Sequence, residues 1–299
     1  VELPWKDDGA SSLKDNRASA EVRLAGLSRK LAKDPDLQKR YDAALQEMEQ
    51  TGVVAEVPPE ELASSYPTFY LPHRPVVKES SSTTKVRPVF DASARGPNGL
   101  SLNDCLEVGP CLIPSLVELL LRFRRWKVAV TADIRKAFLQ IGLRREDRDV
   151  HRFLWWQDGR ERIMRFQTLT FGVSSSPFLL GATIRHHLSK FPPSRAILEM
   201  MDNFYVDDLL SCADSEEEAG SLLAEAQSVL ADAGMVLTKC QSNGRMVFDK
   251  AHAAAGSGEE EGVKVLGVTW IPSDDAFSFQ GVTLPSDIVP TKRVVLSVM

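Results

Sequence analysis

Residues Phe204-Tyr205-Val206-Asp207-Asp208-Leu209-Leu210 place two adjacent carboxylates between apolar side chains. Burying neighbouring carboxylates is unfavourable unless a cation neutralises them, and Asp is depleted in β-strands. An isolated Asp-Asp pair is most often a turn, and that alternative stays open at this point. The apolar flanks favour a hairpin that carries Asp207 and Asp208 at a metal site.

A second acidic residue of this kind is Asp133, in the alternating segment 127–134. Val128, Val130, Ala132 and Ile134 would line a core face of a strand, and Asp133 would lie on the opposite, working face. Alone, Asp133 could equally be a strand-end residue. The 74 positions between Asp133 and Asp207 (207 − 133) leave room for a helix and a hairpin, so the two acidic segments can be neighbouring strands.

Three carboxylates on adjoining strands suit Mg²⁺, which prefers oxygen ligands and keeps water or substrate phosphate in its shell. Two such ions, about 3.5–4 Å apart, would serve an in-line phosphoryl displacement. Mn²⁺ is the alternative metal. The constellation therefore predicts nucleotidyl or phosphoryl transfer.

The surrounding pattern predicts an α+β fold. Helical signals occupy much of 1–57, where Asp34 is an N-cap and Gly52 a C-terminal stop, and recur at 115–126, from Ser176, and at 215–233. Capping boxes are expected at Ser115/Glu118 and Ser215/Glu218. Strands are expected at 74–79, 85–90, 127–134, 152–156, 162–166, in a hairpin at 203–212, and at 263–270, with loops at 80–84, 158–159 and 252–261. The order around Asp133 is that of a split βαβ arrangement, an antiparallel sheet backed by helices.

Composition is that of a globular protein, with 299 residues, 43% hydrophobic and 26% charged. The net charge of -5 argues against nucleic-acid binding, but residues 122–165 hold thirteen Lys or Arg and six Asp or Glu, a local charge of +7. This basic segment is either a phosphate-binding surface or a solvated face. Four cysteines without CxxC spacing, no signal peptide and no apolar run long enough for a bilayer predict an intracellular protein. We expect the chain to be a piece of a longer polypeptide.

Five ordered segments resemble reverse transcriptases. Tyr205-Val206-Asp207-Asp208 is similar to their YxDD box, and Thr131-Ala132-Asp133-Ile134 to their first catalytic strand. The other three are Lys85-Val86-Arg87-Pro88-Val89-Phe90, Phe171-Gly172-Val173-Ser174-Ser175-Ser176-Pro177-Phe178 and Val265-Leu266-Gly267-Val268-Thr269-Trp270. Several phrases, among them Tyr70-Leu71-Pro72-His73 and Ser101-Leu102-Asn103-Asp104-Cys105, resemble the Pao/BEL group of long-terminal-repeat retrotransposons.

The resemblance implies roles for individual residues. Asp133, Asp207, Asp208 and the Ile134 carbonyl would bind two Mg²⁺ ions, and Lys239 would protonate pyrophosphate. Arg87, Lys78, Phe171 and Gly172 would bind the incoming nucleotide, and Phe138 would exclude a ribose 2′-hydroxyl. Leu266 and Gly267 would form the primer grip. Phe171 departs from the Gln that retroviral enzymes usually carry at this position.

The resemblance also implies a right-hand polymerase with fingers, a ferredoxin-like palm and a partial thumb. We expect a helical extension at 1–57, fingers at 58–125, a palm at 126–245 with an inserted fingers hairpin at about 145–170, and primer-grip strands with the start of a thumb or connection at 246–299. The implied partners are a template with primer, dNTPs, and an upstream protease with a downstream RNase H and integrase in a polyprotein, within a cytoplasmic virus-like particle. Two alternatives stay open, a catalytically inactive or domesticated nucleic-acid-binding remnant and an RNA-templated RNA polymerase; Phe138 argues against the second.

Overall fold

The computed structural model describes residues 1–63, 65–78, 85–157, 159–244 and 262–278. The chain divides into two compact units, Val1–Ile113 with Arg135–Pro192 and Ala233–Met235 as unit 1, and Pro114–Ile134 with Pro193–Asp232 and Val236–Met299 as unit 2. The expected loops at 80–84 and 252–261, Asp158 of the expected turn, and the expected thumb beyond residue 278 lie outside the described residues.

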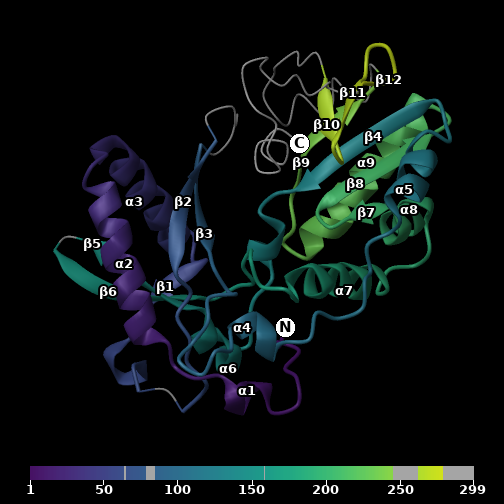
Figure 1. The fold of residues 1–299 in the computed structure, drawn as a ribbon. Coiled ribbons are helices and arrows are strands. Elements are labelled where there is room, and N and C mark those ends of the chain that lie inside the picture. The colour runs from purple at the N-terminus through teal and green to yellow at the C-terminus, as the bar shows by residue number, and fades with distance from the viewer. Residues whose placement is uncertain (64, 79–84, 158, 245–261, 279–299) are drawn as a thin grey trace, which may run out of the picture. The chain divides into compact units, whose positions relative to one another are not determined.

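Unit 1 begins with helices α1 (Gly9–Ser12), α2 (Arg17–Leu31) and α3 (Pro35–Gln50). Leu24, Leu27 and Leu31 form a buried apolar face of α2. The side chain of Asp34 accepts a hydrogen bond from the Leu37 amide (3.0 Å) as the predicted N-cap of α3. Gly52 has a positive φ of 73° just beyond α3, as its predicted C-terminal role requires. In Figure 1, α3 lies beside β3 and α2 beside β5.

Unit 1 also contains two antiparallel sheets and several shorter elements. β2 (His73–Val77) pairs antiparallel with β3 (Val86–Phe90), close to the predicted strands. β5 (Arg152–Gln157) and β6 (Arg160–Phe166) form the predicted second hairpin. β1 (Val54–Glu56), a strand that was not predicted, pairs antiparallel with β6. The short helices and turns are η1 (Pro59–Glu61), α4 (Leu102–Cys105), η2 (Ala137–Gln140), α6 (Arg145–Arg148) and η3 (Asp149–His151), and α7 (Ser176–Leu188) is the predicted helix that begins at Ser176.

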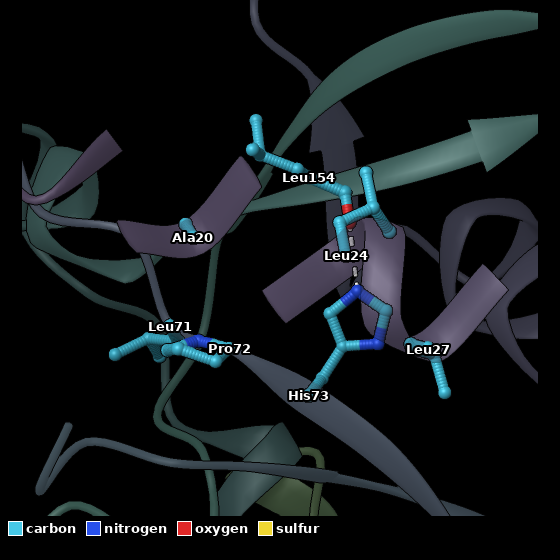
Figure 2. Close-up of a pocket in the computed structure, with 7 residues that line it drawn as sticks. All are labelled: Ala20, Leu24, Leu27, Leu71, Pro72, His73 and Leu154. Atoms are coloured by element: carbon cyan, nitrogen blue, oxygen red, sulfur yellow. Dashed lines mark hydrogen bonds between the residues drawn. The ribbon is translucent and has the colours of Figure 1, made fainter. Parts of the chain in front are cut away.

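A buried imidazole ties the N-terminal helices to these strands. His73 Nε2 lies 2.7 Å from the Leu154 carbonyl oxygen, and its Nδ1 lies 2.5 Å from the Tyr41 hydroxyl. Burial lowers the pKa of His73 to about 4, so the ring is neutral, donating from Nε2 and accepting at Nδ1. Figure 2 shows the ring beside a cavity of about 10 Å³, room for about one water molecule.

Unit 2 is built on a four-stranded antiparallel sheet in the order β7-β8-β4-β9. Its strands are β4 (Val128–Ile134), β7 (Phe204–Tyr205), β8 (Asp208–Ala213) and β9 (Leu237–Ser242), and its helices are α5 (Leu116–Phe123), α8 (Arg195–Asn203) and α9 (Glu216–Asp232). With β7 and β8 as a hairpin and helices before and after it, this order is ferredoxin-like. The predicted split βαβ arrangement is confirmed.

Different elements cover the two faces of this sheet. Ser211 of β8 donates to Glu199 of α8 (2.8 Å), and α9 lies beside α8 against β4 and β8. On the opposite face, Ala129 and Leu210 pack with side chains of α5 and with Trp270. The predicted working face of β4 is therefore buried at Ala129 and Thr131, and only Asp133, at the strand end, is partly exposed. The prediction of one core face and an opposite working face is therefore wrong at Ala129 and Thr131, because α5 and a small sheet cover this face, and Asp133 alone stays partly exposed.

Three further expectations need correction. The predicted single strand at 263–270 is a hairpin of β10 (Val263–Val265) and β11 (Val268–Ile271), extended by β12 (Ala276–Ser278). Ser115 makes no side-chain cap to α5, so the first capping box is wrong. At α9, Ser215 accepts from the Glu218 amide as predicted, but Glu218 accepts from the Asp214 amide rather than that of Ser215.

Within the described ranges, the structure contains no helix with the length and apolar character needed to cross a membrane.

Candidate active site

The acidic segments are neighbours on β4 and β8. Asp133 lies directly opposite Asp208 in the antiparallel register, and the Ile134 amide donates to the Asp207 carbonyl oxygen (2.9 Å). Residues directly opposite in such a pair share a face, with Cβ atoms about 4.5–5.5 Å apart. The prediction that the two carboxylate-bearing strands lie side by side is confirmed.

Val206 and Asp207 form a two-residue turn between β7 and β8, closed by the Tyr205–Asp208 pair. Val206 has a φ of 60°, a conformation that is rare for a β-branched residue. Tight hairpins of this length need positive φ, which Gly, Asn or Asp adopts more easily. The turn is therefore strained, and strain of this kind concentrates at ligand-binding and catalytic sites.

The charged forms of the acidic turn are disfavoured first by burial and then by repulsion between the carboxylates. Burial raises the pKa of Asp208 to about 6, with the Asp207 and Asp133 carboxylates adding to the effect. Burial and Asp133 also raise the pKa of Asp207. Both shifts mean that the charged forms are poorly compensated within the protein.

Lys239 provides the cation that partly offsets this charge. Its Nζ lies 3.1 Å from Oδ2 of Asp133. Lys239 has a φ of 50° and sits where the β4–β9 register shifts between Thr131 and Asp133. This irregularity of β9 brings the ammonium to the same strand end as the three carboxylates.

The donor set has the chemistry of a site for hard divalent cations. Three carboxylates face one ammonium, an excess of two negative charges when all are ionised. Among the residues that the structure describes, no three His, Cys, Asp or Glu side chains already converge as a metal-binding group, and Asp133 is ion-paired with Lys239. The residue types and charge fit Mg²⁺, and the carboxylates need side-chain rearrangement to bind it.

A second predicted set of residues lies in unit 1, around β3. Arg87 is on the exposed side of β3, opposite Val76. The Lys78 amide donates to the Lys85 carbonyl (2.8 Å), and Lys78 is exposed at the end of the hairpin. Arg87 lies in β3 and Lys78 directly follows β2, so both cations belong to one hairpin, and their role in nucleotide binding stays a prediction.

Phe138 and Phe171 form an aromatic pair in the same unit. Their rings meet edge to face with centroids 4.8 Å apart; Phe138 is buried, whereas Phe171 is 52% exposed. Gly172 follows with a φ of +91°, and a Cβ there would lie 2.6 Å from the Phe90 carbonyl oxygen. Only glycine fits this position, because both the conformation and the contact with the end of β3 exclude a side chain.

Leu266 and Gly267 form the turn between β10 and β11 in unit 2. Both have positive φ, 48° and 93°, between the paired residues Val265 and Val268. Leu266 packs on the core cluster that also contacts Tyr205. The acidic hairpin and the Leu266–Gly267 hairpin thus rest on one apolar cluster.

Two features of these sites were not predicted from the sequence. One is the ion pair between Lys239 and Asp133. The other is Asn103, whose side chain bonds to the loop that contains Gly172. Asn103 belongs to Ser101-Leu102-Asn103-Asp104-Cys105, a segment quoted above only for its resemblance to the Pao/BEL group.

Several solved structures with a similar fold are foamy viral protease-reverse transcriptases. The foamy viral protease-reverse transcriptase dRH in complex with double-stranded DNA aligns with a TM-score of 0.58 and 16% identity, over 87% of this chain and 39% of that one. The foamy viral protease-reverse transcriptase with an RNA/DNA hybrid gives 0.54 and 17%, over 81% and 27%. A prototype foamy virus protease-reverse transcriptase mutant gives 0.51 and 20%, over 68% and 24%.

At these identities the structural matches show a shared fold, that of a right-hand polymerase. This chain spans about a quarter to two fifths of the length of these polypeptides. No curated protein matches by sequence. The family described as reverse transcriptase (RNA-dependent DNA polymerase) matches residues 81–270, well over half of the chain. Together with the paired carboxylate strands of unit 2, this match shows that the chain belongs to the reverse transcriptase family.

Proposed function

We propose that this chain carries the polymerase centre of a Pao/BEL-type retrotransposon reverse transcriptase and catalyses RNA-directed DNA synthesis. The observation that carries the proposal is the pairing of Asp133 with Asp208 at the end of a ferredoxin-like sheet, beside the strained turn that holds Asp207. Family membership gives the class of enzyme, nucleotidyl transfer. The charge excess at this strand end gives the reason to assign the chemistry there.

The carboxylates of Asp133, Asp207 and Asp208 would hold two Mg²⁺ ions, with the Ile134 carbonyl as a further ligand and Mn²⁺ as a substitute. When bound, the ions supply a lowered pKa for the primer 3′-hydroxyl and charge compensation for the leaving pyrophosphate. The protein contributes position and charge, since the strand pair fixes Asp133 against Asp208. Lys239, placed by its ion pair at the same strand end, would donate a proton to pyrophosphate.

The residues of unit 1 would bind the incoming nucleotide. Arg87 and Lys78 carry the charge for a triphosphate, and a guanidinium can bind phosphate oxygens in a bidentate manner. Phe138 would exclude a 2′-hydroxyl, and Phe171 would offer an apolar contact where a Gln is usual. In unit 2, Leu266 and Gly267 would contact the primer.

The implied partners are a primed RNA or DNA template and dNTPs. Two of the foamy viral structures contain double-stranded DNA or an RNA/DNA hybrid, which supports this choice of ligand. We also propose the subdomain limits given above, an intracellular site of action, and neighbouring protease, RNase H and integrase regions in the parent polyprotein.

Primer extension on an RNA template with Mg²⁺ and dNTPs tests this function, with Asp207→Asn as the matched control. We expect extension by the wild type and a loss on the order of a thousandfold or more in the variant, because one of the three carboxylates that would hold the ions loses its charge. Template–primer binding without extension by a folded protein would favour the inactive remnant instead. Phe138→Ala should admit ribonucleotides, whereas equal use of both nucleotide types by the wild type would favour an RNA polymerase.

A further inference from the structure

The Asn103 side chain joins two loops that are distant in sequence. Its Nδ2 donates to the Gly172 carbonyl and to Ser93 Oγ, both at 2.9 Å. Its Oδ1 accepts from the Ser174 amide, also at 2.9 Å. One amide group therefore fastens the loop that precedes α7 to the loop that follows β3.

Asn103 is itself held rigidly. It lies in the single turn α4, whose N-terminal end is fixed by a complete capping box between Ser101 and Asp104. Its neighbours Leu102 and Cys105 are buried, and its own amide donates to the Ala92 carbonyl (3.1 Å). A side chain supported in this way can fix the position of what it binds.

The loop that Asn103 binds carries the half-exposed aromatic ring. Phe171 directly precedes Gly172, and Gly172 is pressed against the end of β3, the strand that carries Arg87. The same loop holds Phe171 edge-on against Phe138. The position of Phe171 relative to Phe138 and β3 thus depends on the segment that Asn103 anchors from the side.

An amide is the group that this junction needs. Gly172 presents a carbonyl acceptor and Ser174 an N–H donor, so the bridging side chain must donate and accept at once. A carboxylate would set an acceptor against the Gly172 carbonyl, and an alanine would leave both backbone groups without this partner.

We propose that Asn103 is a positioning residue for the nucleotide-binding loop, and that it sets affinity for the incoming dNTP and discrimination against ribonucleotides through Phe171 and Phe138. The inference rests on the proposed polymerase function. Asn103 touches neither reacting atoms nor metal ligands, and it acts only through the loop.

Steady-state kinetics of Asn103→Ala and Asn98→Ala test the proposal. Asn98 is the matched control, because its side chain also donates to a backbone carbonyl, that of Ser12 (2.8 Å), and accepts from a backbone amide, that of Leu100 (3.3 Å). For Asn103→Ala we expect the KM for dNTP to rise about tenfold and the preference for dNTP over rNTP to fall, with kcat and template–primer affinity within about threefold of wild type. Asn98→Ala should change none of these quantities, and equal behaviour of the two variants would overturn the proposal.

A second variant guards against a folding defect. Asn103→Asp keeps the acceptor for the Ser174 amide but sets an acceptor against the Gly172 carbonyl, so its KM should rise at least as far as that of Asn103→Ala. If Asn103→Ala fails to fold, a wild-type KM and a wild-type nucleotide preference in Asn103→Asp would overturn the proposal.

Hydrogen exchange separates this inference from the polymerase assignment. The Ser174 amide should exchange at least about tenfold faster in Asn103→Ala than in wild type or Asn98→Ala, whether or not the protein extends primers. Absence of extension by the wild type would refute the proposed function alone. Unchanged Ser174 exchange would refute the anchoring by Asn103, with or without polymerase activity.

Discussion

The ion network of unit 1 and the carboxylate cluster of unit 2 use the same side-chain types with opposite charge balance. In unit 1, Asp149 Oδ1 accepts from Arg152 Nε and Arg165 Nη1, both at 2.9 Å, and Arg165 also contacts Glu61 (2.8 Å). Arg152 and Asp149 are almost fully buried. Arg145 also pairs with Glu61 (2.9 Å), so three guanidinium groups face two carboxylates and each carboxylate is compensated by cations of the protein.

In unit 2, three carboxylates have only the Lys239 ammonium beside them. The pKa shifts follow the same division, since hydrogen bonds from Arg145 and Arg165 hold the pKa of Glu61 below its usual range, whereas burial raises those of Asp207 and Asp208. A network whose carboxylates are compensated by cations of the protein stabilises the fold. A cluster left with excess negative charge is suited to a cationic ligand, and the function proposed above assigns it a divalent metal ion.

The largest effect on stability should come from a substitution in the buried ion network of unit 1. Asp149→Asn would leave Arg152 and Arg165 buried with too little compensating charge, and we expect a loss of about 3–5 kcal/mol in the free energy of unfolding. Urea denaturation measures this loss. Asp36→Asn, in an exposed pair with Arg40, is the control and should cost less than about 1 kcal/mol. Similar costs for the two variants would show that burial of the Asp149 network does not matter.

The cluster of unit 2 should respond in the opposite direction. Because the folded-state pKa of Asp208 is raised to about 6, its carboxylate penalises the fold increasingly as pH rises from about 4 to 6, and the penalty is complete above that range. Asp208→Asn should therefore stabilise the metal-free protein by about 2 kcal/mol at pH 8 and by nothing near pH 4.

Thermal unfolding in EDTA at the two pH values measures this gain. Mg²⁺ should stabilise the wild type more than Asp208→Asn, since ion binding to the folded state adds stability. A variant that is less stable than wild type at pH 8 in EDTA would contradict the idea of uncompensated charge at this site.

Local sequence signals predicted much of this fold. The alternation in 127–134 and the Tyr205–Asp208 segment placed Asp133 beside the acidic hairpin correctly, and Asp34 and Gly52 marked the ends of α3. These signals lie within a few residues of the structure they specify. The sheet order followed because short connections and alternating elements allow few arrangements.

Features that depend on distant partners were not predicted. β1 has only three residues and gains its strand character by pairing with β6. The pair Val54–Phe166 spans 112 positions (166 − 54), a separation that no local periodicity encodes. The turn at Leu266–Gly267 lacks the Asn-Gly or Asp-Gly signal of tight hairpins, so the pattern at 263–270 predicts one strand where the structure has two. The ion pair of Lys239 depends on the irregular β4–β9 register. The contacts of Asn103 depend on the path of a loop about 70 residues away.

The smallest effect concerns a neutral buried base in unit 1. Burial lowers the pKa of His73 to about 4, so its contribution to stability is complete above pH 6.5 and is lost as pH falls toward 4. We expect the wild type to lose about 1 kcal/mol through His73 between pH 7.5 and 5.5, and His73→Gln to lose that much less over the same interval. Urea denaturation at both pH values measures the two slopes, with the exposed His186→Gln as a control that should retain the wild-type slope. Because acid protonates His73 in unit 1 and relieves repulsion at Asp208 in unit 2, the two regions should respond to the same pH change with opposite signs. Equal slopes in wild type and His73→Gln would remove the imidazole from that contrast.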